Sequence, residues 1–238
     1  VRFNMRDIEE NAKALNVLWN MHNLIVRSAR AAGIDPTKAT FKDENLDFTD
    51  RWLLSVYSSL VDTVTEKFES FHLSDIPVLL RHFWLEDLSR WYVQNKRPQI
   101  AAGDETTMAV LSHVYLDLLR LVSPMVPMTT EGIYQDLRKE YGLEEETVHL
   151  QEWVESDASR IDEDIERDME ILRDVTTNVL AAREKVNRGV RWPLRNVDVI
   201  TRDKRVISVL AKQGELVKRL TNAWELVVKQ HEESLTHV

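Results

Sequence analysis

Apolar residues recur every three or four positions through most of the chain, which is the spacing of one face of an α-helix. The first stripe comprises Ile8, Ala12, Leu15, Leu18, Trp19, His22, Ile25 and Ala29. The second comprises Trp52, Val56, Leu60, Val64, Phe68 and Phe71, and the third comprises Leu80, Phe83, Trp84, Leu88 and Trp91. A fourth and a shorter fifth follow over residues 108–125 and 133–137. Since short polar stretches join these helices, the pattern predicts an up-and-down bundle of antiparallel neighbours.

Proline and capping residues indicate where these helices begin and end. Asp47 or Thr49 can accept hydrogen bonds from the first turn of the second helix. The third helix is expected to stop at Arg97-Pro98, because proline cannot continue helical hydrogen bonding. Pro124 and Pro127 predict a tight corner before the fifth helix.

Residues 140–170 change the character of the chain and suggest a domain boundary. They hold thirteen acidic side chains against two arginines, a net charge of −11. A long helix over 162–186, a strand over 197–200 and two helices near 203–213 and 215–230 are expected to follow. The predicted fold class is therefore mainly α. It consists of a helical bundle over 1–145 and, over 146–238, a long helix with a small α/β junction domain, which we expect to be truncated.

A basic cluster within this second part opposes the overall charge. Residues 183–205 hold eight basic side chains against three acidic ones, net +5, whereas the whole chain carries −9. Such a cluster holds a positive potential over about 8 to 10 Å and attracts phosphates. The helix dipole accounts for part of the asymmetry, because acid at the start and base at the end of the long helix both stabilise it. Arg191-Trp192-Pro193-Leu194-Arg195 lies at the centre of the cluster.

Several classes of chemistry have no sequence support. The chain has no cysteine, and its six glycines are scattered singly, so neither a thiolate metal site nor a glycine-rich phosphate loop is expected. His231 and His237 are six residues apart, whereas a metalloprotease helix needs a spacing of four. His22, His82 and His113 lie on or beside apolar stripes and are expected to be structural. We therefore expect no catalytic residue, metal site or cofactor here, and no membrane span.

Three stretches in this order resemble the C-terminal anticodon-binding region of class I aminoacyl-tRNA synthetases. They are Glu86-Asp87-Leu88-Ser89-Arg90-Trp91-Tyr92 with Arg97 after it; Leu121-Val122-Ser123-Pro124-Met125-Val126-Pro127 with Glu131-Gly132-Ile133-Tyr134; and Val148-His149-Leu150-Gln151-Glu152-Trp153 with Arg191-Trp192-Pro193-Leu194-Arg195. The last is most similar to the isoleucyl branch of archaeal and eukaryotic type. The chain departs from that pattern at Val154, where many relatives have proline, and in lacking a cysteine-rich zinc module.

The resemblance implies a partner and a division of labour. The parent enzyme would use ATP and Mg²⁺ to esterify tRNA(Ile) in the cytoplasm, with its catalytic and editing domains preceding residue 1 of the same polypeptide. This segment would bind tRNA(Ile), with no role for DNA or a membrane, and would be inactive alone. Two alternatives remain open. One is the same region of a valyl-tRNA synthetase, and the other is a noncatalytic helical scaffold that binds proteins through residues 140–170.

Exposed cations and aromatic faces are the expected means of holding tRNA. The candidates are Lys96, Arg97, Arg188, Arg191, Trp192 and Arg195. Lys96 and Arg97 are expected to meet phosphate at the end of the third helix, and the other arginines to meet backbone phosphate at the junction. Trp192 either stacks on a base or wedges the junction onto the bundle, and we expect the wedge.

Overall fold

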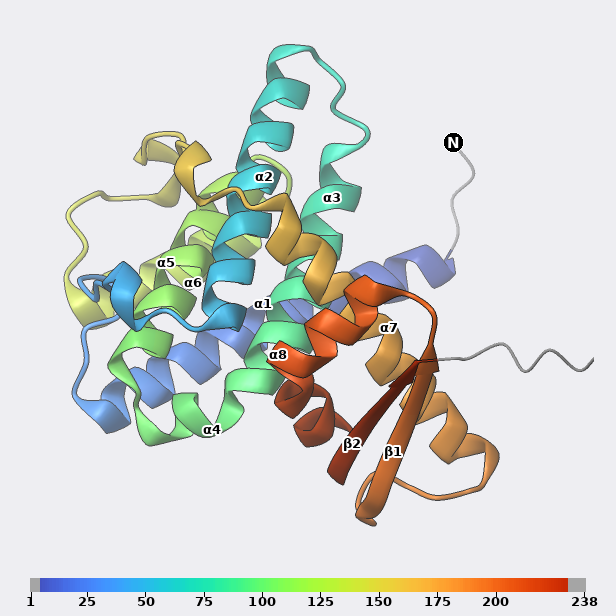
Figure 1. Ribbon diagram of the computed structural model, residues 1–238. Coiled ribbons are helices and arrows are strands. Elements are labelled where there is room, and N and C mark those ends of the chain that lie inside the picture. The colour runs from blue at the N-terminus through green and yellow to red at the C-terminus, as the bar shows by residue number, and fades with distance from the viewer. Residues whose placement is uncertain (1–4, 231–238) are drawn as a thin grey trace, which may run out of the picture. The chain divides into compact units, whose positions relative to one another are not determined.

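A computed structural model describes residues 5–230 and shows two compact units, Val1–Asp162 and Glu163–Val238. The predicted mainly α fold is confirmed in both units (Figure 1). The division lies after Asp162, whereas we had expected it after residue 145. The difference arises because residues 146–162 pack on the first unit, where Val148 and Val154 are buried.

The first unit is a helical bundle, and its helices follow the predicted stripes. It comprises α1 (Met5–Ala32), α2 (Phe48–Glu69), α3 (Ile76–His82), the π-helix η2 (Phe83–Val93), α4 (Gln94–Ala102), α5 (Glu105–Val122) and α6 (Pro127–Tyr141), with the short turns η1 (Asp43–Asn45), η3 (Val148–Leu150) and η4 (Ala158–Arg160). Helix α5 is the most deeply buried, because its side chains contact α1, α2, α4 and α6. Its Asp104 N-cap accepts a hydrogen bond from the Thr107 N–H, as a helix start requires.

Helix α2 begins with a capping box that also binds a buried lysine. The Asp47 side chain accepts from the Thr49 and Asp50 N–H groups, and the Asp50 carboxylate accepts from the Asp47 N–H. Lys96 Nζ of α4 lies 2.7 Å from Asp47 Oδ2 and 2.8 Å from Asp50 Oδ2. The Tyr92 hydroxyl donates to Asp50 Oδ1 at 2.8 Å. This buried cluster therefore joins the start of α2 to η2 and α4.

The third predicted helix differs from expectation in two ways. Its central part is the π-helix η2, whose wider turns shift the buried face, so that Tyr92 is fully buried and Trp91 only partly. The predicted stop at Pro98 is wrong, because α4 continues to Ala102 and ends at Gly103, which has a φ of 70°. Pro98 lies one turn after the change from π to α geometry, where the backbone hydrogen bonding is already rearranged.

The segment after α6 packs on the first unit through Trp153. Trp153 packs edge-on against Phe68, with ring centroids 5.2 Å apart, and its Nε1–H donates to Thr65 Oγ1 at 2.9 Å. Trp153 therefore anchors this segment to α2. Phe71, which was expected on the same stripe as Phe68, lies beyond the end of α2 and is 84% exposed.

The second unit contains α7 (Glu163–Lys185), β1 (Leu194–Thr201), α8 (Lys204–Thr221) and β2 (Ala223–Gln230). The two strands pair in parallel, with Leu194 opposite Ala223. The predicted helix over 215–230 is therefore wrong beyond Thr221. Asn222 ends α8 in the left-handed conformation with a φ of 50°, which asparagine tolerates, and the strand begins at the next residue.

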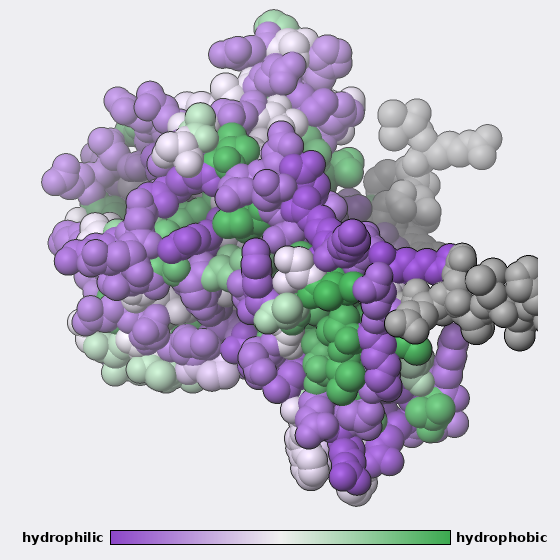
Figure 2. Space-filling view, viewed as in Figure 1, coloured by the Kyte–Doolittle hydropathy of each residue, from purple (hydrophilic) through white to green (hydrophobic). Residues whose placement is uncertain are grey.

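Helix α8 packs closely on the sheet at a glycine. A Cβ atom added to Gly214 would lie 3.0 Å from Leu226 Cδ2 of β2, so the missing side chain permits the approach. Apolar side chains gather over α8 and β2 in Figure 2, where Leu210, Leu226 and Val228 line a shallow groove. Val209, Val217 and Val197 are buried and form the core of this unit.

Replacing Lys96 should destabilise the bundle strongly, because Asp50 is only 2% exposed and would keep an unpaired buried charge. We expect Lys96→Met to lower the free energy of unfolding by about 3 to 5 kcal/mol, measured by urea denaturation. Lys139→Met, at an exposed lysine of α6, is the matched control and should change it by less than about 0.5 kcal/mol. Adding Asp50→Asn to Lys96→Met should recover part of the loss. A Lys96→Met protein as stable as its control would contradict this role.

His22 should make the stability of the first unit depend on pH. Burial lowers the pKa of His22 below 6.5, although Asp136 at 3.6 Å opposes the shift. Above 6.5 the imidazole is neutral in both states; as pH falls, the unfolded chain takes up the proton first, so folding stability declines. We expect urea denaturation at about pH 7.5 and about pH 5.5 to show a smaller decline in His22→Gln than in the parent chain. Equal declines would show that another group is responsible.

Candidate nucleic-acid interface

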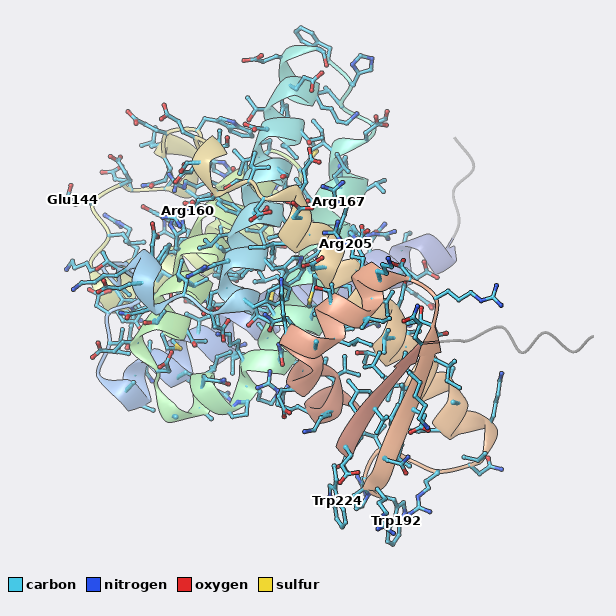
Figure 3. All side chains as sticks on the ribbon, in the orientation of Figure 1. Glu144, Arg160, Arg167, Trp192, Arg205 and Trp224 are labelled. Atoms are coloured by element: carbon cyan, nitrogen blue, oxygen red, sulfur yellow. The ribbon has the colours of Figure 1, made fainter. Side chains whose placement is uncertain are left out.

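The part of the basic cluster from Arg183 to Arg195 lies around the amino end of the two-stranded sheet. Because β1 and β2 are parallel, their first residues lie at the same end, and the loop from α7 enters β1 there. Figure 3 shows Trp192, before β1, and Trp224, near the start of β2, at this end of the unit. The motif around Trp192 is therefore brought next to a residue more than thirty positions later in the sequence.

Arg183, one residue of the basic cluster, holds this loop from inside the unit. It is 3% exposed, and its guanidinium donates to the Thr221 carbonyl at 3.1 Å, to the Gly189 carbonyl at 2.7 Å and to the Trp192 carbonyl. These acceptors belong to the end of α8 and to both sides of the loop. Arg183 is therefore a structural residue that fixes the backbone of the loop against α8.

Asn222 fixes the same loop from the other side. Its Nδ2 donates to the Val190 carbonyl at 2.8 Å, and its backbone carbonyl accepts from the Leu194 N–H at 2.9 Å. The Trp192 N–H donates to the Gly189 carbonyl at 3.1 Å and closes the turn. The loop backbone at the sheet end is thus held by hydrogen bonds on both sides.

Four of the seven remaining cations of the cluster fall into two groups. Arg205 lies 2.7 Å from Asp168 and 3.1 Å from Asp164 at the start of α7, and its hydrogen bond lowers the pKa of Asp164. Arg188, Arg191 and Arg195, which the sequence predicted as contacts for RNA phosphate, have exposed side chains at the sheet end. The positive charge available to a ligand is therefore smaller than the count of basic residues suggested, because Arg183 and Arg205 are engaged within the fold.

Trp192 has a side chain that is 66% exposed, and its loop is held within its own unit by the Arg183 and Asn222 hydrogen bonds. This exposure favours stacking over the wedge that the sequence led us to expect. Trp224 is not among the residues that the sequence predicted for this site. It lies at the same end of the sheet and is 67% exposed. Asn222 could have indicated it, because asparagine is suited to end a helix and a strand that begins there would include Trp224.

Lys96 and Arg97, the two candidate RNA contacts in the bundle, differ in their exposure. Lys96 is only 3% exposed, and its ammonium is held by Asp47 and Asp50, so the prediction of a phosphate contact is wrong. The reason is that the helix continues past Pro98, which places Lys96 in its interior rather than at its end. Arg97, the next residue, is exposed, and a role in RNA binding remains a prediction for it.

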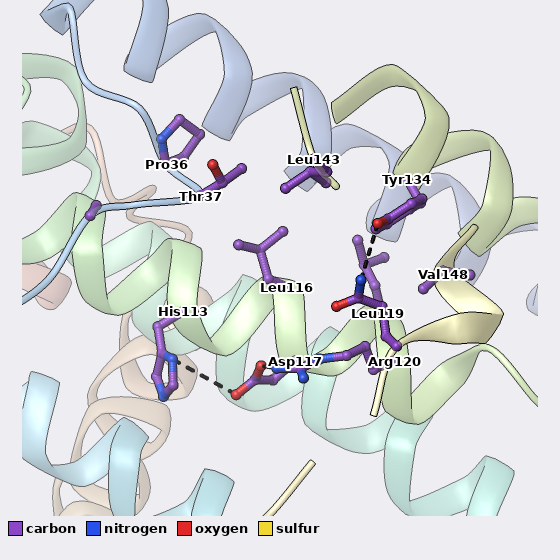
Figure 4. Close-up of a pocket in the computed structure, with 12 residues that line it drawn as sticks. Pro36, Thr37, His113, Leu116, Asp117, Leu119, Arg120, Tyr134, Leu143 and Val148 are labelled. Carbon is purple, nitrogen blue, oxygen red and sulfur yellow. Dashed lines mark hydrogen bonds and ion pairs between the residues drawn. The ribbon is translucent and has the colours of Figure 1, made fainter. Parts of the chain in front are cut away.

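A pocket of about 270 Å³ in the bundle holds a cluster of polar residues but has the features of a structural site (Figure 4). Its Asp117 carboxylate accepts the Tyr57 hydroxyl at 2.5 Å, pairs with Arg120 and lies 3.8 Å from His113. Burial, followed by the charge of Asp117, raises the pKa of Tyr57 far above its usual value. Because its oxygens are already engaged, this carboxylate is poorly placed to accept a proton from a substrate.

The histidines differ in their exposure. His22 is buried, whereas the side chains of His82 and His113 are 64% and 46% exposed. Within residues 5–230, no group of three metal-ligating side chains could hold an ion, and no helix is long and apolar enough to cross a membrane. His231 and His237 lie outside the described residues.

Comparison with known proteins finds similarity to a family of tRNA ligase domains and to isoleucine–tRNA ligases. Residues 50–199 match the family described as the anticodon-binding domain of tRNA ligase. The isoleucine–tRNA ligase of Pyrococcus horikoshii is 33% identical over 99% of this chain and 22% of its own length. That of Methanopyrus kandleri is 34% identical over 95% of this chain and 21% of its own length. The chain therefore spans about a fifth of the curated relatives it matches.

Removing the Arg183 head group should loosen the loop. We expect Arg183→Met to lower the free energy of unfolding by about 3 kcal/mol. Hydrogen bonds from a charged donor contribute roughly 1.5 to 3 kcal/mol each, and the three carbonyls would lose their partner. Amide hydrogen exchange should speed up at Trp192 and Leu194. Lys185→Met removes the same charge from an exposed neighbour and is the control. Unchanged exchange at both amides would argue against the bracing role.

Proposed function

Because the chain belongs to the family of anticodon-binding domains of tRNA ligases, we propose that it is the tRNA-binding segment of an isoleucine–tRNA ligase. It holds tRNA(Ile) in the cytoplasm for aminoacylation by the catalytic domain of the same polypeptide, which also carries the editing domain. ATP and Mg²⁺ serve that catalytic domain, and this segment carries out no chemical step. The family match over most of the chain is the observation that carries the proposal.

The sheet end of the second unit provides a physical means of binding. Arg188, Arg191 and Arg195 are exposed beside a loop whose backbone is fixed, so their positions vary less than those of arginines on a free tail. Each guanidinium that pairs with a phosphate releases counterions, which makes binding stronger at low salt. Since the whole chain carries −9, the three arginines also set the orientation in which a polyanion can approach.

Discrimination among tRNAs distinguishes the proposal from its alternatives. The similar relatives are isoleucine–tRNA ligases, which favours tRNA(Ile) over tRNA(Val) as the partner. They also favour an RNA-binding role over that of a protein scaffold. Tighter binding of tRNA(Ile) than of tRNA(Val) by the 238-residue chain is expected, and binding of neither at low salt would refute the proposal.

The phosphate assignment can be tested by the salt dependence of binding. Replacing Arg191 and Arg195 together with alanine should weaken tRNA(Ile) binding and flatten the plot of log affinity against log salt by about two units, if both residues contact phosphate. Affinity would be measured between about 50 and 200 mM salt. Arg27→Ala with Arg51→Ala removes the same charge from exposed positions on α1 and α2 and is the matched control. An equal flattening in both double variants would assign the effect to net charge alone.

A further inference from the structure

Two tryptophans are far more exposed than the rest, and both lie at the same end of the sheet. The chain has seven tryptophans. Trp192 and Trp224 are 66% and 67% exposed, whereas none of the other five exceeds 39%. Two large exposed aromatic faces together usually mark an interaction site rather than a random surface.

The strand register places an arginine beside Trp224. Leu194 is opposite Ala223 and Asn196 is opposite Glu225, so Arg195 is opposite Trp224, on a strand about 5 Å away. Opposed residues in a parallel pair project from the same face of the sheet, whereas Glu225 projects from the other face because successive side chains alternate. A cationic group and an aromatic face are therefore presented together.

The backbone that carries Trp192 is held in place. Its carbonyl accepts from Arg183 and its N–H donates to the Gly189 carbonyl, while Asn222 binds the loop beside the start of β2. Trp224 follows Asn222 by two residues and lies within the strand. Both tryptophans are thus mounted on a fixed backbone, which lowers the entropy lost when a ligand binds.

We propose that Trp192 and Trp224 form a stacking site for unpaired RNA bases, with Arg195 and Arg191 binding the adjoining phosphates. The charge beside the pair favours RNA as the occupant, because Arg191 adjoins Trp192 in the sequence and Arg195 is opposite Trp224 in a chain of net charge −9. Unpaired bases offer free aromatic faces, whereas the bases of a duplex are stacked on one another. This inference rests on the proposed tRNA-binding function and identifies the part of the RNA that is bound.

Binding of single-stranded and double-stranded RNA separates stacking from phosphate contact. The probes are a labelled, uridine-rich RNA of about 12 nucleotides and the duplex of the same strand, measured by fluorescence anisotropy. Trp192→Leu with Trp224→Leu should weaken single-strand binding about 10- to 100-fold, leave its salt slope unchanged, and change duplex binding by less than about 2-fold.

Conservative and distant substitutions serve as controls. Trp192→Phe with Trp224→Phe keeps two aromatic faces and should retain most of the single-strand affinity. Phe71→Leu removes an exposed aromatic ring from the first unit and should have no effect. Both tryptophans are at the surface, so the double leucine variant should keep its helical circular dichroism.

The outcomes separate this site from the proposed function. If the parent chain binds tRNA through Arg191 and Arg195 but the double leucine variant binds the single strand equally well, the stacking site is wrong and the tRNA-binding function stands. If the parent chain binds neither tRNA nor the single strand, both are wrong. Equal loss of single-strand and duplex binding in the leucine variant would also overturn the stacking site, because it would indicate a general disturbance.

Discussion

The bundle depends most on the ion pairs of one buried group, the ammonium of Lys96. It lies between the carboxylates of Asp47 and Asp50, and the Tyr92 hydroxyl occupies another oxygen of Asp50. Burial alone would raise the pKa of Asp47, but hydrogen bonds from Lys96 and Thr49 bring it down to about 2. Burial instead raises the pKa of Asp50. One lysine therefore keeps the capping box of α2 attached to α4, and its removal would affect both helices.

Further buried polar contacts join other pairs of helices in the bundle. Tyr57 of α2 donates to Asp117 of α5, and Tyr115 of α5 donates to the Leu18 carbonyl of α1 at 3.0 Å. Trp84 of η2 reaches the Ala14 carbonyl of α1 at 3.1 Å. Apolar packing has no direction, whereas each of these bonds is satisfied at only one relative position of its two helices. Each of these bonds therefore favours one relative position of the two helices that it joins.

The sequence predicted the helices well because their apolar periodicity is local information. Side-chain roles that depend on distant residues were predicted less well. Pro98 predicts the end of a helix and therefore places Lys96 at that end. No local pattern indicates that Lys96 forms ion pairs with Asp47 and Asp50, which lie more than forty residues earlier in the chain. Trp91 was expected to be buried because an α-helical turn was assumed where the structure has a π-helix. At the candidate site, Arg188, Arg191 and Arg195 were identified, but Trp224 was not, because the pairing of β1 with β2 is a tertiary feature.

The basic cluster shows why the number of cations in a sequence overstates what a ligand can use. Arg183 is buried under three backbone carbonyls and Arg205 is paired with Asp164 and Asp168, so both act within the fold. For the proposed RNA binding, the contribution of Arg183 is indirect. A loop that is already ordered would lose less conformational entropy on binding RNA, so each exposed arginine would retain more of its interaction free energy. The exposed arginines therefore depend on the buried Arg183, because Arg183 fixes the loop backbone from which Arg188 and Arg191 extend.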